Sequence, residues 1–316
     1  MAGLERKDGR LALALQGGGS FGAFEWGVLD RLLEEGAEFD AISGASAGSV
    51  NAVLVASGLQ RGGPGGARAT LAGFWDDVGE TPSLPSFALS ALAASVQFVS
   101  PYYHNPLGLN PLRDLLAKHV DFDRLRAHPP MGLMIAATRV RDGGLRIFRE
   151  DEVTLETVLA SACLPLMHRA VEIDGEAYWD GAFSANPPIR RLAIETEAED
   201  LLVVQIMPEE IETIPHLATE ITQRAHMISF NASLRREMQS LDDLRASCTG
   251  TRALLSPTCR KLRRLRVHRL AAMDHVPDLA SNSMLDTSRT LLTKLHSAGR
   301  QAASEWLSRG EAREAA

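Results

Sequence analysis

Cysteine is scarce in this chain of 316 residues. Only Cys163, Cys248 and Cys259 occur, and their spacing matches no metal-ligand motif. An odd number of cysteines without such spacing makes a disulfide framework unexpected. We therefore expect a reducing, cytoplasmic setting.

Long apolar runs are also absent. The first such run, residues 11–15, is too short for a secretory signal or a membrane span. Residues 81–112 contain no Asp, Glu, Lys or Arg, but prolines and serines interrupt them too often for a span. We expect this segment to form buried helices and loops or, alternatively, an apolar cap over an acyl-chain pocket.

Positive charge is in deficit, with 33 Lys and Arg against 40 Asp and Glu, which gives a net charge of −7. This balance argues against a nucleic-acid-binding protein. The exception is residues 260–269, where six of ten residues are Lys or Arg. A solvated edge strand protected by charge is the favoured interpretation, and contact with anionic lipid headgroups is the alternative.

Apolar strands alternate with helical patterns along the chain. Strands are expected at residues 11–16, 131–138 and 201–206, with a hairpin at 171–179 that delivers Asp180. Helices are expected after residue 22, from about 154 to 163, and from 189 onward. This order predicts an α/β fold, a three-layer α/β/α sandwich with a mostly parallel central sheet.

We expect three regions. Residues 1–10 form a polar N-terminal segment, and residues 11–210 form the catalytic domain. Residues 211–316 form a mainly helical C-terminal extension packed on the same domain, with helices at 215–244 and 284–307.

The clearest local signal is Gly44-Ala45-Ser46-Ala47-Gly48. An apolar run leads into it and a helix pattern follows, which is typical of a strand–turn–helix elbow that exposes a serine beside a helix N-terminus. We expect the helix to run from Ala47 to Ser57, to end at Gly58, and to be followed by a flexible connection at 61–66. Ser46 is the candidate nucleophile.

The first strand ends in a glycine loop, Gly17-Gly18-Gly19-Ser20-Phe21-Gly22, which allows two interpretations. The spacing Gly17-x-Gly19-x-x-Gly22 fits a dinucleotide fingerprint, which requires an acidic residue at the end of the second strand. Glu38 and Asp40 instead precede that strand, and the serine elbow follows it. An oxyanion hole made of glycine amides is therefore preferred.

These two motifs, followed by Asp180-Gly181-Ala182, resemble the three motifs of patatin-like phospholipases. The resemblance covers about residues 11–206. It implies a dyad without histidine, with Ser46 as nucleophile, Asp180 as base and the amides around Gly17, Gly18 and Gly19 as oxyanion hole. It requires no metal and no cofactor. The chain departs from the family at Phe21, where a basic residue is usual, which weakens any charge-based grip on a phosphate headgroup.

The sequence thus predicts a serine acyl hydrolase that cleaves lipid carboxylic esters through an acyl-enzyme. One alternative is a carboxylesterase or thioesterase for smaller or polymeric hydroxyacyl substrates, and another is a dinucleotide-binding oxidoreductase. The partners expected are a lipid or acyl-ester substrate and, peripherally, a membrane. His168 is interpreted as structural, and Asn186 as either a brace for the Asp180 loop or a helix cap.

Overall fold

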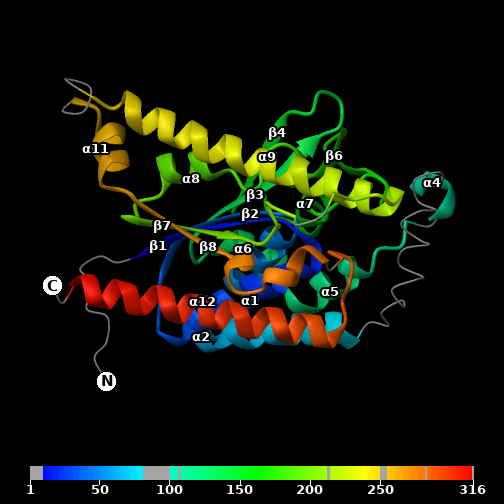
Figure 1. The fold of residues 1–316 in the computed structure, drawn as a ribbon, viewed down its shortest axis with the longest axis horizontal. Helices are drawn as coiled ribbons and strands as arrows, with labels where there is room; N and C mark the ends of the chain where they lie inside the picture. The colour runs from blue at the N-terminus through cyan, green and yellow to red at the C-terminus, as the bar shows by residue number, and fades with distance from the viewer. Residues whose placement is uncertain are drawn as a thin grey trace.

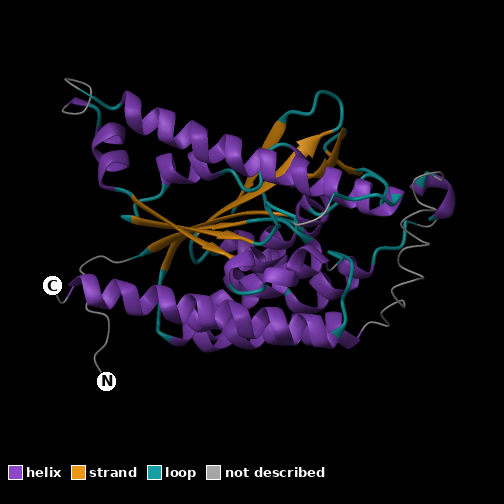
Figure 2. Cartoon of the chain, viewed as in Figure 1, coloured by secondary structure: helices purple, strands orange, loops and turns teal. Residues whose placement is uncertain are grey.

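The computed structural model describes residues 10–80, 100–105, 108–211, 214–249, 255–281 and 283–314. Their strands form one eight-stranded sheet in the order β5-β6-β3-β2-β1-β7-β8, and β4 also pairs with β3. Helices cover both faces of this sheet and make three layers (Figure 1, Figure 2). The predicted α/β/α sandwich with a mostly parallel sheet is confirmed.

The centre of the sheet is parallel and buried on both faces. Strand β1 (Leu11–Leu15) lies between β2 (Phe39–Ala45) and β7 (Asp200–Gln205). Its leucines enter the core on one face, and Ala12 and Ala14 enter the core on the other. A strand buried on both faces needs apolar residues at every position, which explains its uninterrupted apolar sequence.

The two ends of the sheet differ. β3 (Gly132–Arg139) continues the parallel sheet beyond β2, and then pairs antiparallel with β4 (Leu145–Arg149) and β6 (Glu176–Asp180). β5 (Val171–Ile173) completes the hairpin with β6. At the opposite edge, β8 (Arg266–Ala271) pairs parallel with β7. The later half of the basic run is therefore an edge strand, as predicted.

Three long helices cover one face. They are α1 (Gly22–Glu34), α2 (Ala47–Glu80) and, from the C-terminal region, α12 (Arg289–Glu314). Helices α1 and α12 pack so closely that a Cβ on Gly27 or Gly299 would overlap the backbone of the other helix. Asp30 of α1 also pairs with Arg300 of α12 and Arg68 of α2. The C-terminal helix is thus part of the layer that supports the central strands.

The course of α2 differs from the prediction. The helix does not end at Gly58 but continues to a kink at Gly62 and Gly63, which lies within the connection predicted at residues 61–66. A Cβ on Gly58 would lie 2.4 Å from the Cα of Ala67, so this glycine allows the two halves of α2 to approach one another. The final helix also begins later than predicted, because residues 284–288 run across the glycine loop before α12 starts.

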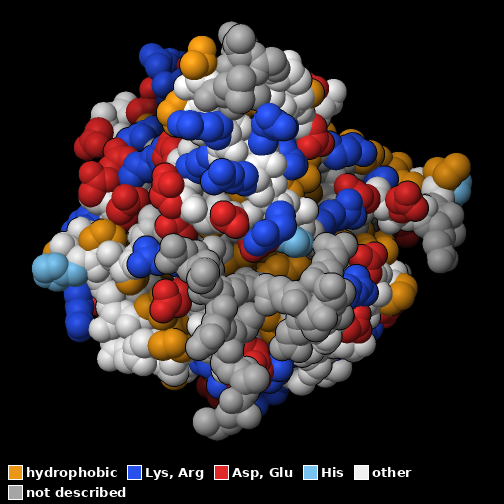
Figure 3. Space-filling model, turned by 90° about the vertical axis from the view of Figure 1, so that its left-hand side faces the viewer, with side chains coloured by type: hydrophobic (Ala, Val, Ile, Leu, Met, Phe, Trp, Pro, Cys, Tyr) orange, Lys and Arg blue, Asp and Glu red, His pale blue; other side chains and the backbone are white. Residues whose placement is uncertain are grey.

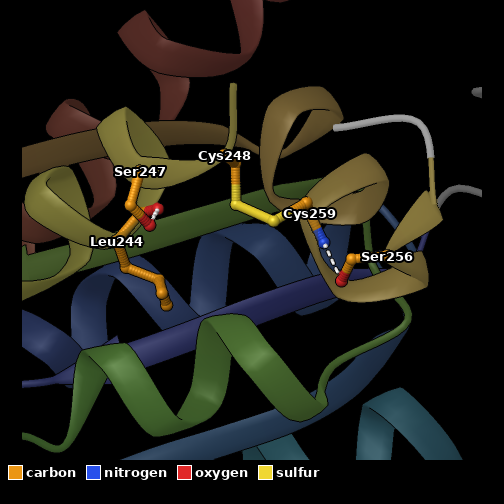
Figure 4. The surroundings of a disulfide bond; sticks show 5 residues. All are labelled: Leu244, Ser247, Cys248, Ser256 and Cys259. Carbon is orange, nitrogen blue, oxygen red and sulfur yellow. Dashed lines mark hydrogen bonds between the residues drawn. A yellow bond between two sulfur atoms is a disulfide. The ribbon is translucent and has the colours of Figure 1, made fainter. Parts of the chain in front are cut away.

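The other face is covered by α8 (Ile189–Glu195), α9 (Ala218–Ser247) and α11 (Pro257–Arg264). A disulfide joins Cys248, which follows α9, to Cys259 in α11 (Figure 4). The prediction of no disulfide is wrong, because the fold brings together two cysteines that are 11 residues apart. The cytoplasmic setting was inferred from that absence and stays a prediction.

The fold also contains shorter helices: α4 (Pro101–His104), α5 (Pro111–His119), α6 (Phe122–Ala127) and α7 (Leu155–Ser161). Short 3-10 turns include η1 (Gly19–Phe21) and η2 (Gly181–Phe183). The acyl-pocket interpretation depends mostly on residues 81–99, which lie outside the described residues. Within the part of the chain that the structure describes, no helix is long and apolar enough to cross a membrane.

Candidate active site

Ser46 stands alone between β2 and α2, with a positive φ of 52°. A non-glycine residue in this left-handed region costs roughly 1–2 kcal/mol and therefore needs support from its surroundings. That support comes from the end of α7, where the carbonyl and hydroxyl oxygens of Ser161 accept from the Ser46 amide at 3.2 and 3.0 Å. The Ser49 hydroxyl also donates to the Ser46 carbonyl at 2.6 Å.

The glycines of the elbow are required by close approach rather than by flexibility. A Cβ on Gly48 would overlap the carbonyl of Leu15 in β1, and one on Gly44 would lie 2.5 Å from the backbone of Gly48. A Cβ on Gly17 would lie 2.7 Å from the Cβ of Ser46. The glycine loop and the serine elbow are therefore in direct contact, at the carboxyl ends of β1 and β2.

The amides of the glycine loop differ in whether they have acceptors. The amide of Gly17 donates to Asn186, that of Ser20 to the Met284 carbonyl at 2.9 Å, and that of Phe21 to the Gly18 carbonyl at 3.2 Å. The amides of Gly18 and Gly19 have no hydrogen-bond acceptor among the described residues. These two adjacent donors are available for a substrate oxygen.

Asp180, the last residue of β6, is completely buried. Its Oδ1 accepts from the Ala182 amide at 2.8 Å. Its Oδ2 accepts no hydrogen bond of standard geometry from any described residue. Burial raises the pKa of Asp180 to about 7, although the Ala182 amide and the nearby Ser46 side chain lower it. A carboxyl group with this pKa beside a serine can accept the serine proton near neutral pH.

Backbone contacts fix the position of Asp180. Its amide donates to the Cys163 carbonyl at 2.9 Å, and its carbonyl accepts from the Thr138 hydroxyl at 2.8 Å. A Cβ on Gly181 would overlap the carbonyl of Ala136, so the glycine after Asp180 allows η2 to pack directly on β3. Burial and the neighbouring Asp180 together raise the pKa of the Cys163 thiol to about 12, which leaves this cysteine inert as a nucleophile.

Asn186 links the Asp180 loop to the glycine loop. Its Oδ1 accepts from the Gly17 amide at 2.6 Å, its Nδ2 donates to the Gly17 carbonyl at 3.4 Å, and the side chain is completely buried. A cis peptide bond joins Asn186 to Pro187. These contacts differ from both roles considered from the sequence: Asn186 braces the glycine loop, which carries Gly18 and Gly19, rather than the Asp180 loop, and the N-cap of α8 is Pro188.

Further polar residues hold the same loop and had no local sequence signal. The buried side chain of Gln16 accepts from the amides of Ile206 and Met207 at 2.8 Å and donates to Asn231 of α9 at 3.1 Å. The Met284 carbonyl that accepts from Ser20 belongs to the C-terminal region. Sequence reasoning missed both contacts because their partners lie about 190 to 264 residues away along the chain.

A buried polar junction connects the helices behind the two loops. Asn51 of α2 donates to the Gly22 carbonyl at 3.0 Å and to Glu25 Oε2 at 2.9 Å, and it accepts from the Trp75 indole at 3.0 Å. Burial raises the pKa of Glu25 well above its usual range, which favours the neutral form of this side chain. The junction couples α1, which follows the glycine loop, to α2, which follows Ser46.

The structure therefore gathers all three sequence motifs at one end of the sheet. Ser46, Gly17, Gly18, Gly19 and Asp180 form the centre. The remaining motif residues shape the backbone around it, and they are Gly22, Gly44, Gly48, Gly181 and Ala182. Within the described ranges, no three His, Cys, Asp or Glu side chains gather as metal ligands do.

The structure also bears on the dinucleotide interpretation. Asp40 lies at the amino end of β2, where its Oδ2 accepts from the Thr196 hydroxyl at 2.6 Å and from the Glu197 amide at 2.8 Å. A ribose-binding carboxylate would be needed at the carboxyl end of this strand. Asp40 is thus at the wrong end of β2 and already has partners.

A comparison with protein families confirms the family resemblance that the sequence predicted. The chain matches the patatin-like phospholipase family over residues 13–193, more than half of its length. Among solved structures, VipD from Legionella pneumophila is 14% identical with a TM-score of 0.45, and the match covers 96% of this chain and 67% of VipD. A chain from the complex of SpcU and ExoU of the Pseudomonas aeruginosa type III secretion system is 16% identical with a TM-score of 0.32. That match covers 98% of this chain and 62% of the other. No curated protein of matching sequence was found.

Proposed function

Because the chain belongs to the patatin-like phospholipase family, we propose that it hydrolyses lipid carboxylic esters through a dyad of Ser46 and Asp180. The observation that carries this proposal is the buried Asp180 beside the Ser46 side chain, with an Oδ2 that has no regular partner among the described residues. The direct contact between the elbow and a glycine loop with two available amides supports it.

The reaction has two halves. Ser46 Oγ attacks the acyl carbonyl while Asp180 takes its proton, and the tetrahedral oxyanion accepts hydrogen bonds from the Gly18 and Gly19 amides. When the intermediate collapses, Asp180 returns the proton to the leaving oxygen, and an alcohol or lysolipid departs. Water then attacks the acyl-enzyme, Asp180 again takes the proton, and collapse releases the fatty acid with Ser46 restored.

The pKa of Asp180 suits both roles. A base with a pKa of about 7 is substantially ionised at neutral pH, yet it holds a proton firmly enough to return it to a leaving group. An exposed carboxylate with an ordinary pKa would be a much weaker base. Complete burial of the side chain is thus the feature that lets a carboxyl group act where other serine hydrolases use histidine.

A second candidate is a carboxylesterase or thioesterase for uncharged acyl substrates, and Phe21 favours it. This residue occupies the loop position where the family usually has a basic residue, and its ring is completely buried in the core. It offers no charge to a phosphate headgroup. Substrate selection would then depend on the acyl group more than on the headgroup.

The test compares two substrate series on the full chain: p-nitrophenyl esters of graded chain length, and phosphatidylcholine vesicles with fatty-acid release as readout. We expect hydrolysis of longer acyl chains by the wild type and almost none by Ser46→Ala or Asp180→Asn. Hydrolysis of the free esters without any release from vesicles would favour the second candidate. Undiminished turnover by folded Ser46→Ala would overturn the dyad.

A further inference from the structure

Three arginines share one face of the short helix α11. Arg260, Arg263 and Arg264 are spaced by three and four residues, so they lie on the same side of the helix, and all three are exposed. Figure 3 looks onto this end of the molecule, and Lys and Arg side chains gather on its upper part. This concentration of positive charge contrasts with a net charge of −7 for the chain.

The neighbouring basic residues have partners. Lys261 donates to the Ile194 carbonyl at 2.8 Å, Arg266 binds Asp200 through two bonds of 2.7 and 2.6 Å, and Arg269 approaches Glu209 at 3.3 Å. None of the three face arginines has a carboxylate or carbonyl acceptor among the described residues. Their fifteen donor hydrogens are therefore directed mainly to solvent.

This face is costly to maintain. Like charges three and four residues apart destabilise a helix, and a helix of eight residues is too short to be stable alone. The contacts that hold α11 in place include the buried Leu262, the Ser256 hydroxyl that caps its first turn, the bond from Lys261 to Ile194, and the disulfide to Cys248 at the end of α9 (Figure 4). A rigid support is thus built under a cluster of unneutralised charges.

The cluster lies at the opposite end of the sheet from Ser46. Helix α11 immediately precedes β8, so it is at the amino ends of the parallel strands, whereas the elbow and glycine loop follow the carboxyl ends of β2 and β1 (Figure 1). Most of the exposed large apolar side chains lie elsewhere, although Leu255, just before α11, is exposed as well. Tyr102 and Tyr103 are in α4, whose neighbour Arg169 is in the segment between α7 and β5. A flat lipid surface that reached Ser46 would leave the α11 face in water.

We propose that the face formed by Arg260, Arg263 and Arg264 docks an acidic segment of a protein partner. Guanidinium groups fixed on one helix face match a run of carboxylates, with which they form charge-assisted bidentate pairs. The position of the face leaves the serine site accessible while the partner is bound. This inference goes beyond the proposed hydrolase function and does not depend on it.

The test measures fluorescence anisotropy of a fluorescein-labelled poly-glutamate peptide titrated with the full chain. We expect saturable binding that weakens as salt rises, and about tenfold weaker binding by the triple variant Arg260→Gln, Arg263→Gln, Arg264→Gln. The matched control replaces three exposed arginines elsewhere, Arg61, Arg113 and Arg235, with Gln and changes the net charge equally. It should bind like the wild type.

Ester hydrolysis by the α11 variant should stay at the wild-type rate, which separates this inference from the fate of the serine mechanism. Equal weakening in both triple variants would overturn the proposal, because it would reflect overall charge alone. So would absence of peptide binding by the wild type. Binding to phosphatidylserine-containing vesicles but not to the peptide, lost in the α11 variant, would assign the face to a membrane instead.

A variant without the disulfide provides a second test of the proposal. If the arginines act as a fixed set, Cys248→Ser with Cys259→Ser should weaken peptide binding while the variant remains folded, because α11 loses its covalent attachment to α9. Full affinity in this folded variant would contradict the role of the disulfide as support for the docking face.

Discussion

Replacing Asp180 with Asn should stabilise the protein, and by an amount that depends on pH. Asparagine has nearly the same shape, and its Oδ1 can still accept from the Ala182 amide. The change removes only the ability to ionise in a completely buried position. If Asp180 served packing alone and its pKa were not shifted, the stability gained by Asp180→Asn would not depend on pH.

The magnitude follows from the pKa of the carboxyl group. In the folded protein burial raises it from an ordinary 3.8 to about 7. Below about pH 4 the carboxyl is neutral in both states, and wild type and variant should have similar stability. Between about pH 4 and 7 the unfolded chain loses this proton and the folded chain keeps it, so the wild type becomes progressively less stable. Since one pKa unit corresponds to about 1.4 kcal/mol, the loss reaches about 4 kcal/mol at pH 8.

The assay is urea unfolding of both proteins at pH 4 and pH 8. Other titrating groups contribute equally to both proteins, so the difference between their free energies of unfolding isolates Asp180. We expect a small difference at pH 4 and an advantage of a few kcal/mol for Asp180→Asn at pH 8. A difference that is the same at both values would refute a raised pKa, and with it the assignment of Asp180 as a base near neutral pH.

The same pKa sets one further expectation, and contacts of Asn186, Gly17 and Glu25 set three others. Wild-type kcat/KM should fall tenfold per pH unit below about pH 7, as Asp180 becomes protonated; a flat profile down to pH 5 would contradict this. Asn186→Ala should lower kcat by about 10- to 100-fold with little change in KM, because the Gly17 amide loses its acceptor and the glycine loop shifts; an effect on KM alone would place Asn186 in substrate binding. Gly17→Ala should fold yet lose turnover, because its Cβ would lie 2.7 Å from that of Ser46, and normal activity would show that the loop can move aside. Glu25→Gln should retain activity and gain stability over the wild type as pH rises above the usual carboxyl range, because burial favours the neutral acid. Glu25→Ala should lose about 1–3 kcal/mol in urea unfolding, because one N–H of Asn51 loses its acceptor; equal behaviour of the two variants would argue against a neutral acid.

Much of the architecture could be predicted because the relevant signals are local. The uninterrupted apolar residues of β1 and β7 indicate strands buried on both faces, and the helices after Gly22 and Ser46 follow from periodicity. Ser46 and Asp180 could be singled out because each belongs to a short motif whose backbone geometry demands glycine at fixed positions. The three motifs together identified the family.

The contacts that hold these motifs together could not be predicted in the same way. Asn186 accepts from an amide 169 residues earlier, and Met284 accepts from Ser20 across nearly the whole chain. Neither hydrophobic periodicity nor motif spacing predicts contacts between residues so far apart in the sequence. Gly58 illustrates the related error of interpreting a close-packing glycine as a helix stop, since the two functions have the same local sequence signal.

The disulfide was missed for a similar reason. The prediction rested on the odd number of cysteines and did not consider which two of them could meet. The fold places Cys163 in the core beside Asp180 and brings only Cys248 and Cys259 together. Whether two cysteines can bond depends on the distance between their Cα atoms, here 5.2 Å, which only the packing of α11 against α9 determines.

The reactivity of Ser46 is the most direct test of the serine mechanism. Wild type and Ser46→Ala would be treated with a fluorophosphonate probe at pH 8, and the labelled peptides mapped by mass spectrometry. An activated serine beside an ionised Asp180 should give a single adduct on Ser46 that is absent from the variant and nearly absent from Asp180→Asn. Labelling at another residue, or no labelling of folded wild-type protein, would contradict Ser46 as the nucleophile.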